Sequence, residues 1–144
     1  MTSTQGLLHG ELTEKILKVF FDVRAELGHG FLEIVFHRAL LIALQDAGLR
    51  AESKMPFVVT FRGKQIGRFW ADIVVEGLIL IEIKVAPHIE PRHVAQALNY
   101  LRISNLEVGL ILNFGPSGQF KRVVYANDRK RTAIPSSEVS SAKK

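Results

Sequence analysis

Apolar residues recur at helical spacing over the first third of the chain. From about residue 11 to residue 27 they lie three or four positions apart, which predicts an amphipathic helix that ends at Gly28. A second helix is predicted over residues 31–47. Its residues are apolar nearly all round, so we expect this helix to be buried between other elements.

Shorter apolar runs separated by turn residues predict strands in the rest of the chain. These strands occupy residues 56–61, 66–75, 78–85, 108–113 and 120–125. A third helix, over residues 93–103, is predicted between the third and the fourth strand. The predicted order is α-α-β-β-β-α-β-β, which describes an α/β domain with a mixed sheet flanked by helices.

The predicted strand 78–85 contains a carboxylate and an ammonium group within an apolar run. Strand side chains alternate between two faces, so Glu82 and Lys84 point the same way, while three isoleucines and a valine line the opposite face. Two largely apolar faces are typical of a central strand. A charge buried there is costly unless it is paired, neutralised or bound to a metal. The two charges therefore mark a candidate functional site.

Asp72 lies ten residues before Glu82, on the preceding predicted strand. The hairpin between them decides whether the two carboxylates share a face. A two-residue turn would send Asp72 to the far face. A three-residue loop over 75–77, with its glycine in the left-handed conformation, pairs Val74 with Leu78 and places Asp72 diagonally opposite Glu82. We predict the three-residue loop.

Two carboxylates with room for water suit Mg²⁺ or Mn²⁺, which prefer oxygen ligands in octahedral geometry. Such an ion polarises a phosphodiester and lowers the pKa of a bound water. Lys84 would then stand beside the nucleophilic water or the charge that develops on the phosphoryl group. The alternative is an ion pair of Lys84 with Glu82 or Asp72 that serves only stability, although burying an ion pair seldom stabilises a fold by itself.

Composition narrows the class of protein. The 144 residues fit one domain, and 47% of them are hydrophobic, which is ordinary for a soluble globular protein. No run of eighteen apolar residues is present, and the N-terminus lacks the features of a signal peptide, so we expect no membrane span and a cytoplasmic location. The absence of cysteine excludes disulfides and thiolate chemistry.

The net charge of +5 comes from one end of the chain. Residues 1–118 hold twelve basic and twelve acidic residues, whereas residues 119–144 hold seven basic and two acidic ones. We expect a folded domain over 1–126 and a disordered basic tail over 127–144. The tail is either solvated or an arm that contacts phosphates.

Asp72 followed by Glu82-Ile83-Lys84 on consecutive strands has the D…(D/E)-x-K pattern of the PD-(D/E)XK nuclease superfamily. Further segments extend the match; together with the acidic ones they are residues 27–36, 71–75, 81–84, 96–101 and 110–115. In order and spacing they resemble the GxxExxY protein family, a bacterial and archaeal branch of that superfamily. The resemblance covers residues 10–125 and implies a restriction-endonuclease-like core.

The resemblance implies that Asp72 and Glu82 bind the metal and that Lys84 is catalytic. Glu33, in the motif that names the family, would complete the metal shell or assist catalysis; the alternative is an exposed helix glutamate. Two departures from the family occur near the N-terminus. Phe36 replaces the tyrosine of the motif and so lacks its hydroxyl, and Arg24 stands where the family tends to have a histidine.

Gln96 and Tyr100 resemble a Q-x-x-x-Y motif, and their four-residue spacing places them on one helix face. Gln96 would orient Lys84 or contact the scissile phosphate, or else it is an ordinary surface glutamine. Tyr100 would contact the substrate or pack in the core. His88 and His93 flank the same loop and are left out of the predicted site.

The expected function is metal-dependent hydrolysis of phosphodiester bonds in nucleic acid, with DNA as the expected substrate and Mg²⁺ or Mn²⁺ as cofactor. The alternative is a nucleic-acid-binding or accessory module that keeps the nuclease-like core without cleaving. The neutral body and the lack of an evident target-recognition domain favour this alternative. Hydrolysis of another phosphoester fits the same ion chemistry. Exposed edge strands and the apolar second helix allow a homodimer without requiring one.

Overall fold

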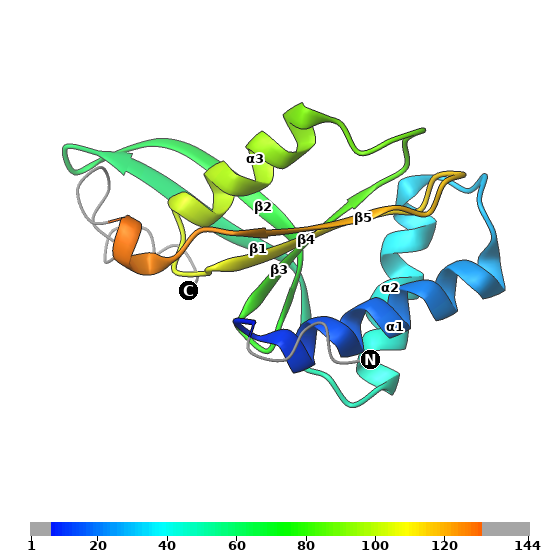
Figure 1. Ribbon diagram of the computed structural model, residues 1–144. Coiled ribbons are helices and arrows are strands. Elements are labelled where there is room, and N and C mark those ends of the chain that lie inside the picture. Colours follow the sequence, from blue (N-terminus) through cyan, green and yellow to red (C-terminus); the bar gives the residue numbers. More distant parts are fainter. Residues whose placement is uncertain (1–6, 131–144) are drawn as a thin grey trace.

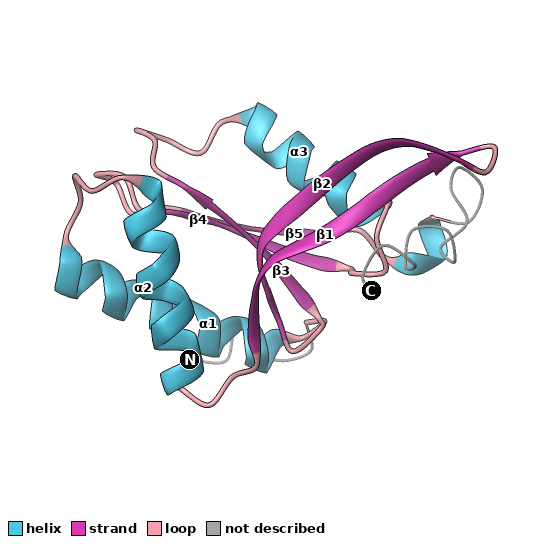
Figure 2. Ribbon diagram, turned by 180° about the vertical axis from the view of Figure 1, so that it is seen from behind, coloured by secondary structure: helices cyan, strands magenta, loops and turns pink. Residues whose placement is uncertain are grey.

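The computed structural model describes residues 7–130, which form a five-stranded mixed sheet between two helical layers (Figures 1 and 2). Helices α1 (Gly10–Leu27) and α2 (Glu33–Asp46) cover one face, and α3 (Pro91–Arg102) covers the other. The strands are β1 (Ala51–Phe61), β2 (Lys64–Val75), β3 (Ile79–Lys84), β4 (Val108–Asn113) and β5 (Phe120–Val124). The predicted element order and fold class are confirmed.

The sheet follows the chain order β1-β2-β3-β4-β5. Neighbouring strands are antiparallel except β3 and β4, which run parallel because α3 carries the chain back between them. This puts β3 at the centre, as its apolar faces predict. Ile79, Ile81 and Ile83 enter the core beneath α1 and α2, and Leu80 enters the core beneath α3.

Helix α2 differs from the prediction that it is buried all round. Its buried apolar residues (Phe36, Leu40 and Leu44) form a single stripe that faces α1 and the sheet. The side chains of Leu32 and Ile42 are 76% and 59% exposed. The prediction was wrong because no described element packs on the outer face of the helix, so hydrophobicity alone does not reveal which side is covered.

The β1–β2 hairpin is longer than predicted. Strand β1 begins at Ala51 rather than at residue 56, because the polar residues at its start pair with the end of β2 and gain strand structure from that partner. Only Ile73–Val75 of β2 pairs with β3. The rest of the hairpin projects away from α1 and α2, as both ribbon views show.

The chain remains attached to the domain beyond the predicted boundary at 126. A short 3₁₀ helix η1 (Asn127–Arg129) follows β5, and the buried Lys130 Nζ donates hydrogen bonds to the carbonyl oxygens of Ser104 and Leu106. These residues differ from the expected disorder. The remainder of the predicted tail, 131–144, lies outside the described residues. No helix within 7–130 is long and apolar enough to cross a membrane.

Candidate active site

The β2–β3 turn brings Asp72 to Glu82. The observed pairs are Val75 with Ile79 and Val74 with Leu80, so the loop spans 76–78. The three-residue length is as predicted, but the predicted pairing of Val74 with Leu78 is wrong by two positions. Extending the observed register one step beyond the last pair places Asp72 level with Glu82 rather than diagonal to it.

Strand β2 turns over at Asp72. Phe69 and Ala71 pack in the core beneath α3, whereas Ile73, two residues further on, packs in the core beneath α1 and α2. Regular alternation would keep all three on one face. Across the hairpin, Lys54 has a left-handed backbone with φ of 59°, which is strained for a residue with a side chain. The turnover points the Asp72 side chain towards β3.

Where β2 and β3 separate, hydrogen bonds to the two carboxylates take the place of backbone-to-backbone hydrogen bonds between the strands. The Ile83 N–H donates a hydrogen bond of 2.7 Å to Asp72 Oδ2, and the Asp72 N–H donates one of 3.4 Å to Glu82 Oε2. Each side chain thus accepts a hydrogen bond from the backbone of the other strand. This exchange holds both carboxyl groups at the same place in the sheet.

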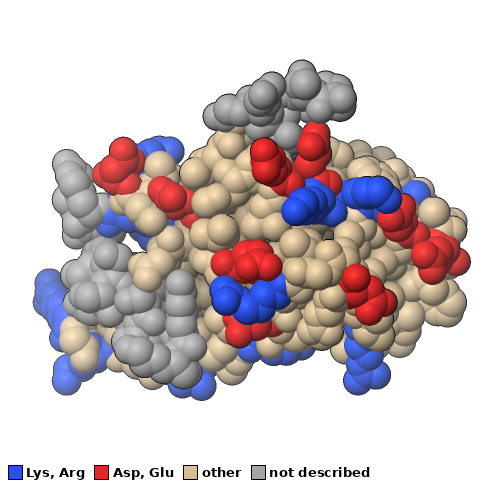
Figure 3. Space-filling view, turned by 90° about the horizontal axis from the view of Figure 1, so that it is seen from below, with Lys and Arg blue, Asp and Glu red and all other residues tan. Residues whose placement is uncertain are grey.

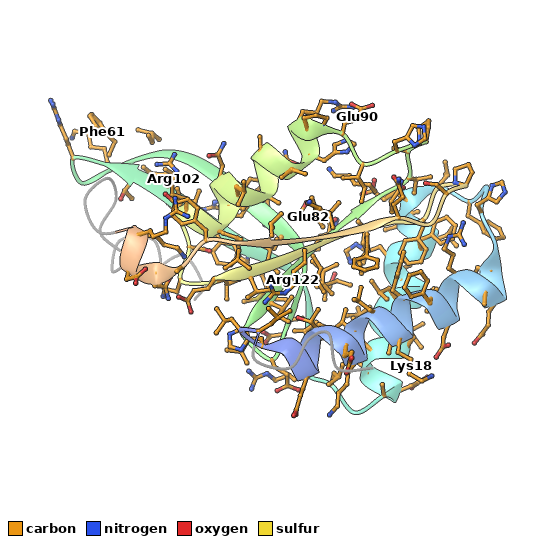
Figure 4. All side chains as sticks on the ribbon, viewed as in Figure 1. Lys18, Phe61, Glu82, Glu90, Arg102 and Arg122 are labelled. Carbon is orange, nitrogen blue, oxygen red and sulfur yellow. The ribbon has the colours of Figure 1, made fainter. Side chains whose placement is uncertain are left out.

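Glu82 is a buried carboxyl group without a neutralising partner. Its side chain lies between the sheet and α3, and the residue is only 6% exposed (Figure 4). Burial, followed by the negative charge of Asp72, raises its pKa to about 8, although Lys84 and the Asp72 N–H oppose this rise. At neutral pH the carboxyl group is therefore largely protonated unless a cation joins it.

Lys84 lies on the same side of β3 as Glu82. Its Nζ donates a long hydrogen bond of 3.4 Å to Gln96 Oε1 on α3. Within residues 7–130 the only salt bridges are Lys18–Asp22 and Arg92–Glu90, so Lys84 is not paired with a carboxylate as the stability-only alternative requires. The Lys84 charge nevertheless lowers the pKa of Glu82, which places it within electrostatic range.

Glu33 approaches this group from the first turn of α2. It is exposed, which agrees with the alternative of an exposed helix glutamate. Partial desolvation and then the charge of Asp72 raise the Glu33 pKa, while Lys84 and Lys54 lower it. The side chain therefore belongs to the same electrostatic cluster while it remains accessible to solvent.

Tyr100 closes the site on the α3 side. Its ring stacks on Phe69 with centroids 3.8 Å apart and planes 7° apart, so it packs in the core. The pKa of its hydroxyl is raised by burial and then by the charges of Glu82 and Asp72. The residue thus combines a packing role with a hydroxyl near the acidic pair.

Two residues near the acidic pair escaped the sequence analysis. His37 is buried, its Nε2 lies 2.7 Å from Ser53 Oγ, and its pKa is lowered by burial, against the opposing charge of Asp72. It follows Glu33 by four residues, and this helical spacing was the available signal. Lys54 acts on the pKa of both Glu33 and His37. The position of Lys54 depends on the pairing register of β1 and β2, and the sequence did not reveal that register.

The remaining residues near the site have structural roles. Phe36 is fully buried and stacks on Phe114 at 4.7 Å, so a ring without a hydroxyl suffices there. Arg24 Nη2 donates to the carbonyl oxygens of Gly115 and Pro116, which fixes the turn before β5. His93 is buried in the first turn of α3 and caps it, because its Nδ1 accepts the Glu90 N–H.

The donor set suits one small hard cation. No group of three or more His, Asp or Glu side chains within 7–130 is arranged to hold a metal ion, so the predicted trio with Glu33 is not assembled. Asp72 and Glu82 nevertheless supply two oxygen donors at one place. Mg²⁺ is commonly held by one or two carboxylates, with water and substrate phosphates as its other ligands. The buried Glu82 carboxyl is the group that such a charge would neutralise.

Comparison with known proteins defines the class. The sequence model of the PD-(D/E)XK nuclease superfamily matches residues 10–123, so the chain belongs to this superfamily, whose nucleases generally use divalent metals. A solved structure described as "Crystal structure of SSO0001" is 18% identical, with a TM-score of 0.53, over 83% of this chain and 80% of that chain. This likeness supports the fold. Comparison with curated proteins gives no match.

Proposed function

We propose that this domain is a metal-dependent nuclease that hydrolyses phosphodiester bonds of nucleic acid, with DNA as its substrate. The observation that carries the proposal is the meeting of Asp72 and Glu82 where β2 and β3 separate. Burial raises the pKa of the Glu82 carboxyl group to about 8, so its ionised form is unfavourable in the folded protein. A bound cation would stabilise that ionised form, and strongly shifted pKa values are common at functional sites. Mg²⁺ or Mn²⁺ is the ion that this donor set favours.

The chain's own groups have separate roles in this proposal. Asp72 and Glu82 hold the ion, which when bound supplies a polarised phosphate and an acidified water. Lys84 places a positive charge beside the phosphoryl oxygens, and Gln96 holds the Lys84 ammonium through its Oε1. Glu33 would accept a proton from water, and the Tyr100 hydroxyl would donate to substrate.

We also infer that the chain belongs to the GxxExxY branch of the superfamily. Gly30 has φ of 112°, a conformation that suits glycine, and it lies in the short link that leads into α2. That link brings Glu33 to the first helical turn and Phe36 into the core. This arrangement of the motif residues is what supports the assignment to this branch.

A cleavage assay tests the nuclease proposal. Purified protein with Mn²⁺ or Mg²⁺ should degrade linear or single-stranded DNA. Asp72→Asn, Glu82→Gln and Lys84→Ala should each lower the rate about 100-fold or more, since each removes a charge that acts at the reacting phosphate. The first two changes keep side-chain size, so folding can be checked by circular dichroism.

Two exposed residues on α1 provide matched controls. Glu14→Gln and Lys15→Ala change the same kinds of charge on the other layer of the molecule, and both should leave cleavage unchanged. A further outcome is that the protein binds DNA or RNA without cleaving either with Mn²⁺ or Mg²⁺. That result would identify the protein as a non-cleaving nucleic-acid-binding module. Cleavage that survives Asp72→Asn would contradict the assignment of the site.

A further inference from the structure

The projecting part of the β1–β2 hairpin has one face covered and one face open. Phe57, Phe69 and Ala71 turn inward and pack beneath α3. Alternate residues must therefore point the other way, and Arg68 pairs with Val58, and Trp70 with Pro56, on that outer face. The ribbon views show the hairpin extending beyond α1 and α2, which cover this face of the sheet elsewhere.

The outer face exposes large apolar side chains. On this face Trp70 is 51% exposed and Ile66 is 65% exposed. Phe61, at the tip of the hairpin (Figure 4), is 55% exposed. Two of them lie beneath guanidinium groups. The Arg68 Cζ is 5.7 Å from the Trp70 ring centre, and the Arg62 Cζ is 4.9 Å from the Phe61 ring centre.

The charge of the hairpin has a single sign. Between Glu52 and Asp72 the chain contains no carboxylate, and its four basic residues are Lys54, Arg62, Lys64 and Arg68. The surface over α1 and α2 is different, because acidic and basic side chains alternate across it (Figure 3). Exposed aromatic rings interleaved with cations are the pattern by which proteins hold unpaired nucleic acid, the rings stacking on bases and the cations contacting phosphates.

We propose that the outer face of this hairpin is a stacking platform for single-stranded nucleic acid, with Trp70 as the base-stacking residue and Arg68 as a phosphate contact. The inference rests on the proposed function, since it adds a second contact surface for the same substrate. Trp70 precedes Asp72 by two residues on β2, about 7 Å along the strand. The platform therefore neighbours the acidic pair along β2, on the sheet face opposite the one on which Glu82 faces α3.

A second copy of the chain is a poorer occupant of this face. A twofold dimer places the same patch on both sides of the interface. Two copies of the hairpin would then bring like charges together, with no carboxylate between Glu52 and Asp72 to offset them. A polyanion offers the opposite charge as well as flat rings. An unpaired strand exposes the faces of its bases, whereas a duplex exposes them only at its ends.

Trp70 is the only tryptophan in the chain, so its fluorescence reports on this surface alone. Metal-free full-length protein in EDTA is titrated with a short oligothymidylate. We expect saturable quenching of the Trp70 emission, and clearly less with a blunt duplex at equal nucleotide concentration. Labelled oligonucleotide anisotropy should show about tenfold weaker binding for Trp70→Ala and little change for Trp70→Phe.

A charge variant tests the phosphate contact. Arg68→Ala should reduce the dependence of log affinity on log salt by about 0.7, which corresponds to one phosphate contact on a single strand. The matched variant Lys15→Ala, on α1, should leave the slope unchanged. Equal slopes for the two variants, an unquenched Trp70, or equal quenching by the duplex would each overturn the proposal.

The two proposals fail separately. With Mg²⁺ present, Asp72→Asn should lose cleavage while it retains quenching by the oligothymidylate. Quenching without cleavage by the wild-type protein would reject the nuclease and leave the platform in place. Cleavage by a wild-type protein whose Trp70 emission never changes would reject the platform and leave the nuclease in place.

Discussion

At the scale of single residues, the acidic pair is asymmetric. Asp72 is half-buried and accepts a short hydrogen bond from the Ile83 N–H, whereas Glu82 is buried and accepts only a long one. Of two carboxyl groups held together, the less solvated one takes up the proton. The proton therefore resides on Glu82, which makes this side chain the pH-sensitive part of the site.

This asymmetry predicts the pH dependence of stability. The folded pKa of Glu82 is about 8, and the unfolded value is 4.5, so the folded state binds the extra proton between these limits. The free energy of unfolding of metal-free protein should fall as pH rises from 4.5 to 8, by an amount on the order of 5 kcal/mol from this group. Urea unfolding followed by circular dichroism at several pH values measures it.

The Glu82→Gln variant isolates the contribution of this carboxyl group. Glutamine keeps the shape and the acceptor for the Asp72 N–H but does not titrate. The difference in unfolding free energy between variant and wild type should grow in the variant's favour from pH 5 to pH 8. A constant difference over this range would show that Glu82 ionises normally in the folded protein.

At the scale of elements, the ends of β3 and β4 are tied together by one side chain. Asn113 Oδ1 accepts hydrogen bonds from the N–H groups of Ala86 and Gly115, and its Nδ2 donates to the Ala86 carbonyl. These contacts give Asn113 a structural role. They fix the chain immediately after Lys84, which sets where that ammonium group can reach.

Loss of this tie should destabilise the domain. Asn113→Ala removes three hydrogen bonds in a fully buried position, which should cost about 3 kcal/mol of unfolding free energy. Gly115→Ala should cost at least as much, since an added Cβ would lie 2.0 Å from the Ala86 carbonyl oxygen. Thermal unfolding measures both. As a control, Ser117→Ala, which breaks one exposed hydrogen bond to Pro87, should change stability little.

Helices and strands could be predicted from the sequence where the spacing of apolar residues agrees with the way the element packs in the fold. The α1 stripe and the β4 run, whose bounds match the prediction, are both read directly from residue spacing. The start of β1 was missed because polar residues gain strand structure only from their partner in β2. The exposure of α2 was missed because periodicity identifies an apolar helix but does not say how many neighbours cover it.

At the scale of the whole molecule, the candidate site was half predictable. Alternation along β3 and the hairpin loop placed Glu82, Lys84 and Asp72 together in advance. The turnover of β2 at Asp72 was not foreseeable, because it accompanies an irregularity of the partner strand, the left-handed backbone of Lys54. The electrostatic cluster also joins α2 to α3 across the sheet, and such contacts follow from the packing of layers rather than from any local pattern.

Coupling between metal, proton and fold gives a last prediction for the whole domain. An ion that binds only the folded state at 100 times its dissociation constant should add about 2.7 kcal/mol of stability, or roughly 5–10 °C in Tm. Because the ion must displace the proton from Glu82, this gain should increase from pH 6 to pH 8. Differential scanning fluorimetry with and without Mg²⁺ measures the shift in Tm.

Two variants serve as controls for this Mg²⁺-dependent shift. Asp72→Asn should abolish the shift and Glu14→Gln should preserve it, since only the first removes an oxygen donor of the pair. A Tm that does not change on addition of Mg²⁺ at any pH would mean that the acidic pair holds a proton rather than a cation.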